Sequence, residues 1–182
     1  MGAKLSLGRR VAILRIVFGI LWAIDASFKW RPAFVNGGFK DEVAGAAQGQ
    51  PGWLHPWFQF WIRLLASHGR LFAYATALLE SLIAAGLIVG FARRPGYIVA
   101  VVFSLGIWAI PEGFGGPYTA GATDIGTGVI YAVVFAALYG LETAVSARAW
   151  TVDGWLGRRF PWWESFAEPG GRMSRDGEPG SA

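Results

Sequence analysis

The hydrophobic positions of this chain gather into four long stretches, separated by segments rich in charge, glycine or proline. The stretches lie at about residues 11–30, 70–92, 96–112 and 123–142. A helix of about 20 predominantly apolar residues is long enough to cross the hydrocarbon core of a bilayer. The pattern therefore predicts an all-α protein, a four-transmembrane-helix bundle, in which residues 31–69 form the first loop.

Basic residues at the ends of these stretches predict the orientation of the bundle. They precede the first stretch, fill the turn between the second and third, and follow the fourth: Lys4, Arg9, Arg10, Arg93, Arg94, Arg148, Arg158 and Arg159. Lysine and arginine are enriched in cytoplasmic loops, so both termini are expected in the cytoplasm and the loop 31–69 outside. That loop is a partial exception, because it carries basic residues of its own: Arg31, Lys40, Arg63 and Arg70.

Composition divides the chain into three parts. Residues 1–10 are expected to be a cytoplasmic N-terminus, 11–165 the membrane domain, and 166–182 a disordered tail of glycine, proline, serine and charge. The first apolar stretch exceeds the 7–15-residue core of a signal peptide, so it is interpreted as a retained span. Within 143–165, four tryptophans beside Arg158 and Arg159 are typical of a segment lying on the cytoplasmic membrane surface.

The outer loop contains a run of aromatic residues that predicts a further helix. Trp53, Trp57 and Trp61 are four residues apart and would share one helical face. Tryptophan favours the membrane–water boundary. We therefore expect an interfacial or re-entrant helix over about 53–66, entered through Pro51-Gly52 or broken at Pro56. Its aromatic face would anchor the loop in the interface or, alternatively, act as a lid over a substrate.

The overall composition supports a membrane protein and excludes several functional classes. The chain is 54% hydrophobic, above the average of soluble domains. Its net charge of +4 comes mostly from residues beside the apolar stretches, which indicates contact with anionic lipid rather than nucleic acid. The absence of cysteine excludes disulfides and thiol-held metals. His55 and His68 do not predict a metal site, and no nucleotide-binding or hydrolase motif is present.

Small residues four positions apart predict where helices approach one another. Such pairs include Gly19 with Ala23 in the first stretch, Gly86 with Gly90 in the second, and Ala136 with Gly140 in the fourth. Pairs of this kind allow close packing of membrane helices. No repeated pair of interrupted spans, the signature of many carriers, is apparent, so transport of a solute or ion is the least favoured function.

Glu80 is the only charged residue between Leu71 and Ala92. A carboxylate at the centre of a membrane helix costs about 2.5–3.5 kcal/mol on insertion scales. Glu80 is therefore either a polar contact that joins helices or part of a site for a ligand, proton or ion. Arg15 lies inside the first stretch, and we expect it to interact with Glu80 directly or through water; the alternative is that it extends to the lipid headgroups.

Further polar residues lie near the expected outer surface. Asp25 and Lys29 are spaced i,i+4, which favours a helical ion pair. Thr123 or Asp124 is expected to cap the fourth stretch. Glu112 has no such role, and we predict that it helps form an outward-facing polar pocket with Asp25, Lys29, Trp30 and Trp108.

The order of these features resembles the DoxX/DoxD family of membrane proteins. RIVFGILWAIDASFKW is similar to the first span of that family, through Arg15, Gly19 and Lys29, and ALLESLIAAGLIVGFARRPG to the second, through Glu80, Gly86 and Arg93-Arg94. QGQPGWLHPWFQFW, GPYTAGATDIGTGVIY and GRRFPWW resemble actinobacterial members. The resemblance covers about residues 9–165.

The resemblance implies a multi-pass protein of the bacterial cell membrane. Named members include a small membrane subunit associated with thiosulfate:quinone oxidoreductase, so the implied function is that of a membrane subunit in a quinone-linked redox system. Arg15, Glu80 or Tyr131 would supply polar contacts to a quinone. The implied partners are lipid and a redox protein or further copies of the chain. The alternative is a non-enzymatic scaffold or accessory subunit, and whether the chain is itself a catalyst stays open.

Overall fold

The computed structural model describes residues 6–116, 118, 120–145 and 150–167, and these residues form helices and loops without a β-strand. The α-helices are α1 (Leu7–Lys29), α2 (Phe39–Ala46), α3 (His55–Val89), α4 (Arg93–Ala109), α5 (Thr127–Val145), α6 (Val152–Arg159) and α7 (Pro161–Ala167). A π-helical turn, η1 (Phe34–Gly38), precedes α2, and 3-10 turns η2 (Gly52–Leu54) and η3 (Gly113–Gly115) precede α3 and follow α4. The predicted all-α class is confirmed.

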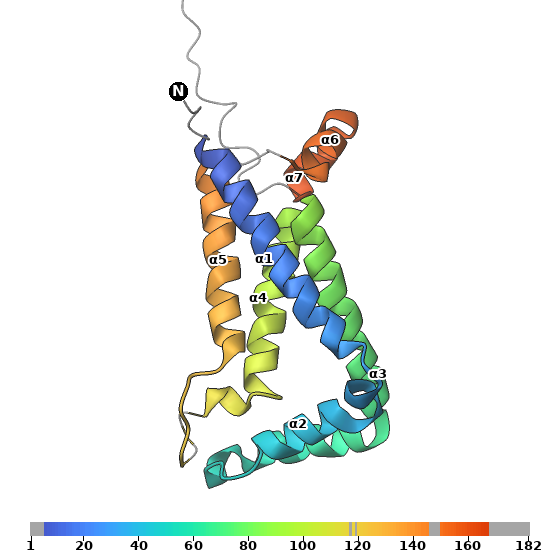
Figure 1. Cartoon of the computed structure of the whole chain (residues 1–182), viewed down its shortest axis with the longest axis vertical. Coiled ribbons are helices and arrows are strands. Elements are labelled where there is room, and N and C mark those ends of the chain that lie inside the picture. The colour runs from blue at the N-terminus through green and yellow to red at the C-terminus, as the bar shows by residue number, and fades with distance from the viewer. Residues whose placement is uncertain (1–5, 117, 119, 146–149, 168–182) are drawn as a thin grey trace, which may run out of the picture.

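Four long helical segments run alternately up and down: α1, the later part of α3, α4 and α5 (Figure 1). α1 packs mainly on α3, and α4 packs mainly on α5. The start of α1, the end of α5 and the pair α6–α7 lie at one end of this bundle (Figure 1). We call this the α6–α7 end, and the opposite end, occupied by α2, the α2 end.

Three of these helical segments are long and apolar enough to cross a membrane, namely Leu7–Lys29, Gly52–Val89 and Thr127–Val145. Large apolar side chains on their outer faces are exposed, as at Leu21, Leu82 and Val133. Extended exposed apolar surface of this kind marks contact with a membrane or a partner. α4 is shorter, with 17 residues, and its outward face is also apolar, as at Ile98 and Val102.

The predicted interfacial helix and the second apolar stretch are parts of one continuous helix, so their separation in the prediction is wrong. α3 has 35 residues and begins after Pro51 and η2. Pro56 lies in its first turn, where the missing N–H has no intrahelical partner to lose, so it does not break the helix. The first part of α3 lies beside α2 across the α2 end, and the rest follows α1 (Figure 1).

The predicted outer loop 31–69 is mostly helical and has a small core of its own. Its buried apolar residues pack with the later part of α3: Phe34, Val35, Phe39, Val43, Leu65 and Ala73. A larger core joins the four long helices: Trp22, Ile83, Ala84, Leu87, Tyr97, Ala100, Phe135 and Leu138. The outer segment is therefore a folded layer that covers the α2 end.

Small residues mediate two close helix contacts, only one of which was predicted. A Cβ on Gly19 would lie 2.9 Å from Leu87 Cβ, so α1 and α3 approach closely there as expected. No atom lies within 4 Å of a Cβ placed on Gly140. The predicted helix contact at Ala136 and Gly140 is therefore wrong. Gly128 brings α5 against α4 instead, with the backbone oxygen of Ser104 at 2.7 Å from the Cβ position.

The segment 150–167 folds against the α6–α7 end. Trp150, Trp155 and Trp162 are each more than half exposed there, whereas Trp163 donates a hydrogen bond to Asp153 Oδ1 at 3.0 Å. α7 extends to Ala167, two residues into the predicted tail. The rest of that prediction, 168–182, lies outside the described residues.

Candidate functional site

Two polar clusters lie toward opposite ends of the bundle. The predicted contact between Arg15 and Glu80 is wrong, because each residue belongs to a different cluster. Arg15 Nε lies 3.1 Å from Glu142 Oε1 at the α6–α7 end. Glu80 lines a pocket toward the α2 end. In an α-helix the Cα–Cβ bond tilts toward the N-terminus. Since α1 and α3 are antiparallel, the two side chains extend in opposite directions.

The first cluster is a chain of four charged residues. Arg93 continues it, with Nη1 3.0 Å from Glu142 Oε2 and Nε 3.1 Å from Asp153 Oδ2. Arg15 also donates to the carbonyls of Leu87 and Trp150. The two arginines and two carboxylates balance in formal charge, and all are buried. Removing one member of such a buried network would leave an uncompensated charge, which is strongly destabilising.

Asp153 fastens α6 to the beginning of α4. Its carboxylate accepts the backbone N–H groups of Ala92 at 2.7 Å and Arg93 at 3.0 Å. This arrangement satisfies otherwise unpaired donors at the start of α4, and a negative charge is favourable at that position. The sequence prediction missed Glu142 and Asp153. Glu142 could have been found from the sequence. A buried Arg15 requires a carboxylate partner, and Glu142 is the last residue of the fourth apolar stretch.

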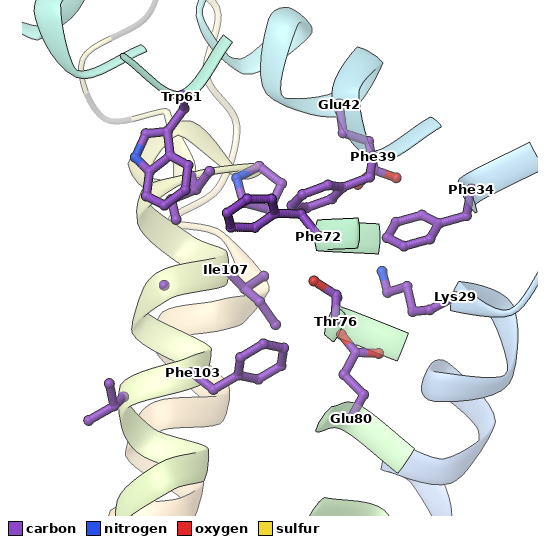
Figure 2. A pocket seen from close by; sticks show the side chains of 14 residues that line it. Lys29, Phe34, Phe39, Glu42, Trp61, Phe72, Thr76, Glu80, Phe103 and Ile107 are labelled. Atoms are coloured by element: carbon purple, nitrogen blue, oxygen red, sulfur yellow. The ribbon is translucent and has the colours of Figure 1, made fainter. Parts of the chain in front are cut away.

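The second cluster lines a half-open cavity of about 300 Å³ among α1, η1, α2, α3 and α4. Its lining is mostly aromatic and aliphatic, and its polar side chains are Lys29, Glu42, Thr76 and Glu80. Figure 2 shows the polar ends of Lys29, Thr76 and Glu80 directed toward one another, with Phe34, Phe39, Phe72 and Phe103 around them. We call this cavity the Lys29–Glu80 pocket. Apolar cavities with a few convergent polar groups are typical ligand sites.

The carboxyl group of Glu80 is only partly satisfied by protein atoms, although Lys29 lines the same pocket. Glu80 is 1% exposed, and its Oε2 has no hydrogen-bond partner within the part of the chain that the structure describes. Lys29 Nζ lies 5.1 Å from the centre of the Phe34 ring, a cation–π distance. Among the described residues, Lys29 and Glu80 form no direct ion pair. Buried polar atoms are nearly always paired, so the unpaired oxygen of Glu80 points to a ligand.

Glu42 lies at the rim of the pocket on α2, outside the helices that could cross a membrane. The residue as a whole is exposed, yet desolvation of its carboxyl group raises its pKa. The charge of Lys29 acts in the opposite direction, and Asp25 raises the pKa further. Glu42 and Asp25 therefore belong to the electrostatic surroundings of Lys29.

The other predicted pocket residues have structural roles elsewhere. Glu112 caps α5, because it accepts from Thr127 Oγ1 and from Gly128 N, the latter at 2.8 Å. The expected cap, Asp124, accepts from Gly126 N at 2.7 Å in the preceding loop. Tyr131 packs against Trp22, with 4.9 Å between ring centres. None of these is among the residues lining the Lys29–Glu80 pocket.

The aromatic residues of the first part of α3 close the pocket from the α2 end. Trp61 is part of its lining. Trp57 Nε1 donates to the backbone oxygen of Ala109 at 2.9 Å, which ties α3 to the end of α4. Trp30 and Trp108 instead hydrogen-bond to Ser81 and to the backbone of Ile125. The residues of the predicted aromatic face thus have two roles: Trp61 lines the pocket, and Trp57 joins α3 to α4.

No group of three or more residues able to hold a metal ion occurs in the described parts of the chain. The Lys29–Glu80 pocket instead combines a cation, a hydroxyl group and a carboxyl group inside an aromatic enclosure. Such a set can bind and exchange protons with an uncharged ring that carries oxygen atoms. No family model, curated protein or solved structure matches the chain, so function is inferred from this site.

Proposed function

We propose that the protein is a four-span integral membrane protein of the bacterial plasma membrane, with the α6–α7 end in the cytoplasm. α4 would be the additional span, since its 17 residues extend about 26 Å at a rise of 1.5 Å per residue. The basic residues Arg94, Arg158 and Arg159 lie at or near the α6–α7 end. Their position supports the predicted orientation.

Within the membrane, the protein is proposed to bind a quinone as a subunit of a quinone-linked redox system, as the DoxX/DoxD resemblance implies. Lys29 and Thr76 would donate hydrogen bonds to one quinone oxygen, and the aromatic side chains would enclose the ring. Reduction of the quinone to a quinol takes up two electrons and two protons. A partner redox protein would supply the two electrons. Glu80 would pass one proton and the Lys29 ammonium group the other, and both groups would be reprotonated from water.

The proposal depends on one observation, the burial and incomplete hydrogen bonding of the Glu80 carboxyl group. Its buried carboxyl group faces an apolar pocket and keeps one oxygen without a partner in the described residues. A purely structural carboxyl at this depth would be expected to pair with Lys29, which is available on the neighbouring helix. A site for a neutral ligand with its own hydrogen-bonding groups accounts for both residues.

Binding of a soluble quinone analogue to the purified protein tests the proposal. Binding is followed by quenching of Trp61 fluorescence, with the Trp61→Phe variant giving the background. We expect Glu80→Leu to weaken binding at least tenfold, because the ligand loses a hydrogen-bond partner in an apolar site. The exposed substitution Asp41→Asn on α2 is the control and should leave binding unchanged.

The pH dependence of binding separates hydrogen bonding from a general effect on folding. Wild-type affinity should fall as the pH rises, because an ionised Glu80 no longer donates a hydrogen bond. Glu80→Gln donates at every pH and should bind with a flatter profile. Glu42→Gln removes the other acid of the pocket and should keep the wild-type slope. Equal profiles for wild type and Glu80→Gln would refute the assigned role.

A second candidate is a non-enzymatic scaffold or accessory subunit of a redox complex. It is favoured by the exposed Trp155 and Trp162 on α6 and α7, which Asp153 holds rigidly against the bundle. Affinity purification in mild detergent tests it. Recovery of a redox partner by wild type but not by the Trp155→Ala/Trp162→Ala variant, with quinone binding intact, would support the scaffold.

A further inference from the structure

The contact between α3 and α4 is unusually open for two consecutive helices. They are joined by the short turn after Val89, yet each packs mainly on another helix, α3 on α1 and α4 on α5. Two cavities lie between them. One is the Lys29–Glu80 pocket, and the second, of about 310 Å³, is lined by α3 and the first half of α4.

The two cavities follow one another along the same helices. The Lys29–Glu80 pocket uses Glu80 on α3 and Val102 to Ile110 on α4. The second cavity uses Leu79 to Leu87 on α3 and Arg93 to Val99 on α4. The exposed side chains of Leu82, Val99 and Val102 lie along this line. We call the combined feature the α3–α4 groove; it faces outward between the helices, where the hydrocarbon part of a bilayer would lie.

Two glycines leave space in this groove. Gly106 lines the Lys29–Glu80 pocket and Gly96 the second cavity. A Cβ added at either position would meet no atom within 4 Å, so neither glycine is required for helix packing. They are about 15 Å apart along α4 at a rise of 1.5 Å per residue. A side chain added at either site would therefore begin in open space beside the groove.

We propose that the α3–α4 groove holds the isoprenoid chain of a lipid-soluble quinone whose ring occupies the Lys29–Glu80 pocket, and that the ligand enters sideways from the bilayer. This inference rests on the proposed function and extends it to the part of the ligand that does not react. One end of the groove carries the charged side chains of Lys29, Glu42 and Glu80, and the lining toward Gly96 is apolar apart from Arg93, which is buried and paired with Glu142 and Asp153. This polarity matches a molecule with one polar end and one long apolar chain.

Paired quinones with the same ring, one without a chain and one with a long isoprenoid chain, test this assignment in lipid nanodiscs. Wild type is expected to bind the long-chain quinone at least tenfold more tightly at equal mole fraction in lipid. Gly96→Leu should remove that advantage and leave binding of the chainless quinone unchanged. Gly106→Leu should weaken both. Gly140→Leu is the matched control, since Gly140 is also a helical glycine with nothing within 4 Å, and should change neither.

The outcomes separate the groove from the pocket. If Gly96→Leu retains the long-chain advantage while the thermal unfolding midpoint is unchanged, the groove assignment is wrong and quinone binding stands. If neither quinone binds wild type, the proposed function fails and the groove assignment fails with it. If only the long-chain quinone binds and Gly96→Leu abolishes that binding, both assignments stand. If mass spectrometry finds a phospholipid that Gly96→Leu alone displaces, its acyl chain is the occupant and the isoprenoid assignment is overturned.

Discussion

Arg15 is completely buried, and its guanidinium group has protein acceptors on three sides: a carboxylate of α5 and backbone carbonyls of α3 and of Trp150. Its Nε contact with Glu142 is the ionic part of this arrangement. Removing one partner of a buried pair leaves an uncompensated charge, and the typical cost is about 3–5 kcal/mol. At the residue scale, stability therefore depends more on Glu142 than on Glu80.

We expect Glu142→Leu to lower the free energy of unfolding by about 3–5 kcal/mol, since both Arg15 and Arg93 lose a carboxylate. Reversible unfolding in mixed detergent micelles measures the change. The double variant Arg15→Met/Glu142→Leu should lose less than Glu142→Leu alone, because it removes the unpaired charge. A double variant less stable than Glu142→Leu would contradict this account, as would a loss below about 1 kcal/mol for Glu142→Leu itself.

The positions of Arg15 and Glu80 in their apolar stretches were predictable, but the directions of their side chains were not. Residue spacing gives depth in the membrane, and by depth alone the two residues are plausible partners. The tilt of side chains toward each helix N-terminus separates them once the helices are antiparallel. Glu112 was misassigned for a related reason: its capping of α5 depends on the path of the loop between α4 and α5.

At the scale of elements, the four long helices follow from hydropathy, whereas the extent of α3 does not. His68, Gly69 and Arg70 interrupt the apolar pattern, but they do not interrupt the helix. Backbone hydrogen bonds continue through polar residues, and a single glycine weakens a helix by only about 1 kcal/mol. The core formed by η1 and α2 with α3 depends on contacts distant in sequence, so hydropathy alone could not reveal it.

Asp153 makes several of the hydrogen bonds that join α6 to the bundle, beside the bond from Arg94 to Ser165 in α7, and this yields a prediction for the α6–α7 pair. Asp153→Ala should release the segment 150–167, since Ala92 N, Arg93 N and Trp163 Nε1 all lose their acceptor. Hydrogen exchange should increase by at least tenfold in α6 and α7 while α1 changes little. Thr151→Ala, which removes the N-cap bond to Gly154 and leaves the Asp153 carboxylate in place, is the comparison and should have a smaller effect. Equal protection in both variants would contradict the role of Asp153.

At the scale of the whole molecule, the orientation of the proposed membrane protein can be tested directly, because the chain has no native cysteine. A membrane-impermeant maleimide applied to intact cells should label Ser67→Cys, in α3 near the α2 end, and not Val152→Cys, in α6. Both residues are exposed. Permeabilised cells should show labelling of both. The reverse pattern in intact cells would invert the orientation, and labelling of both would contradict a single orientation.

The charge network also constrains how the protein is made. Arg15 and Arg93 are synthesised before Glu142 and Asp153, the carboxylates to which their side chains are paired. During synthesis, the first three long helices must therefore exist for a time with two unmatched positive charges near one membrane surface. The four long helices can complete their packing only after residues 142–153 have emerged from the ribosome. Chains that stop earlier would remain incompletely assembled and recognisable to the proteases that remove immature membrane proteins.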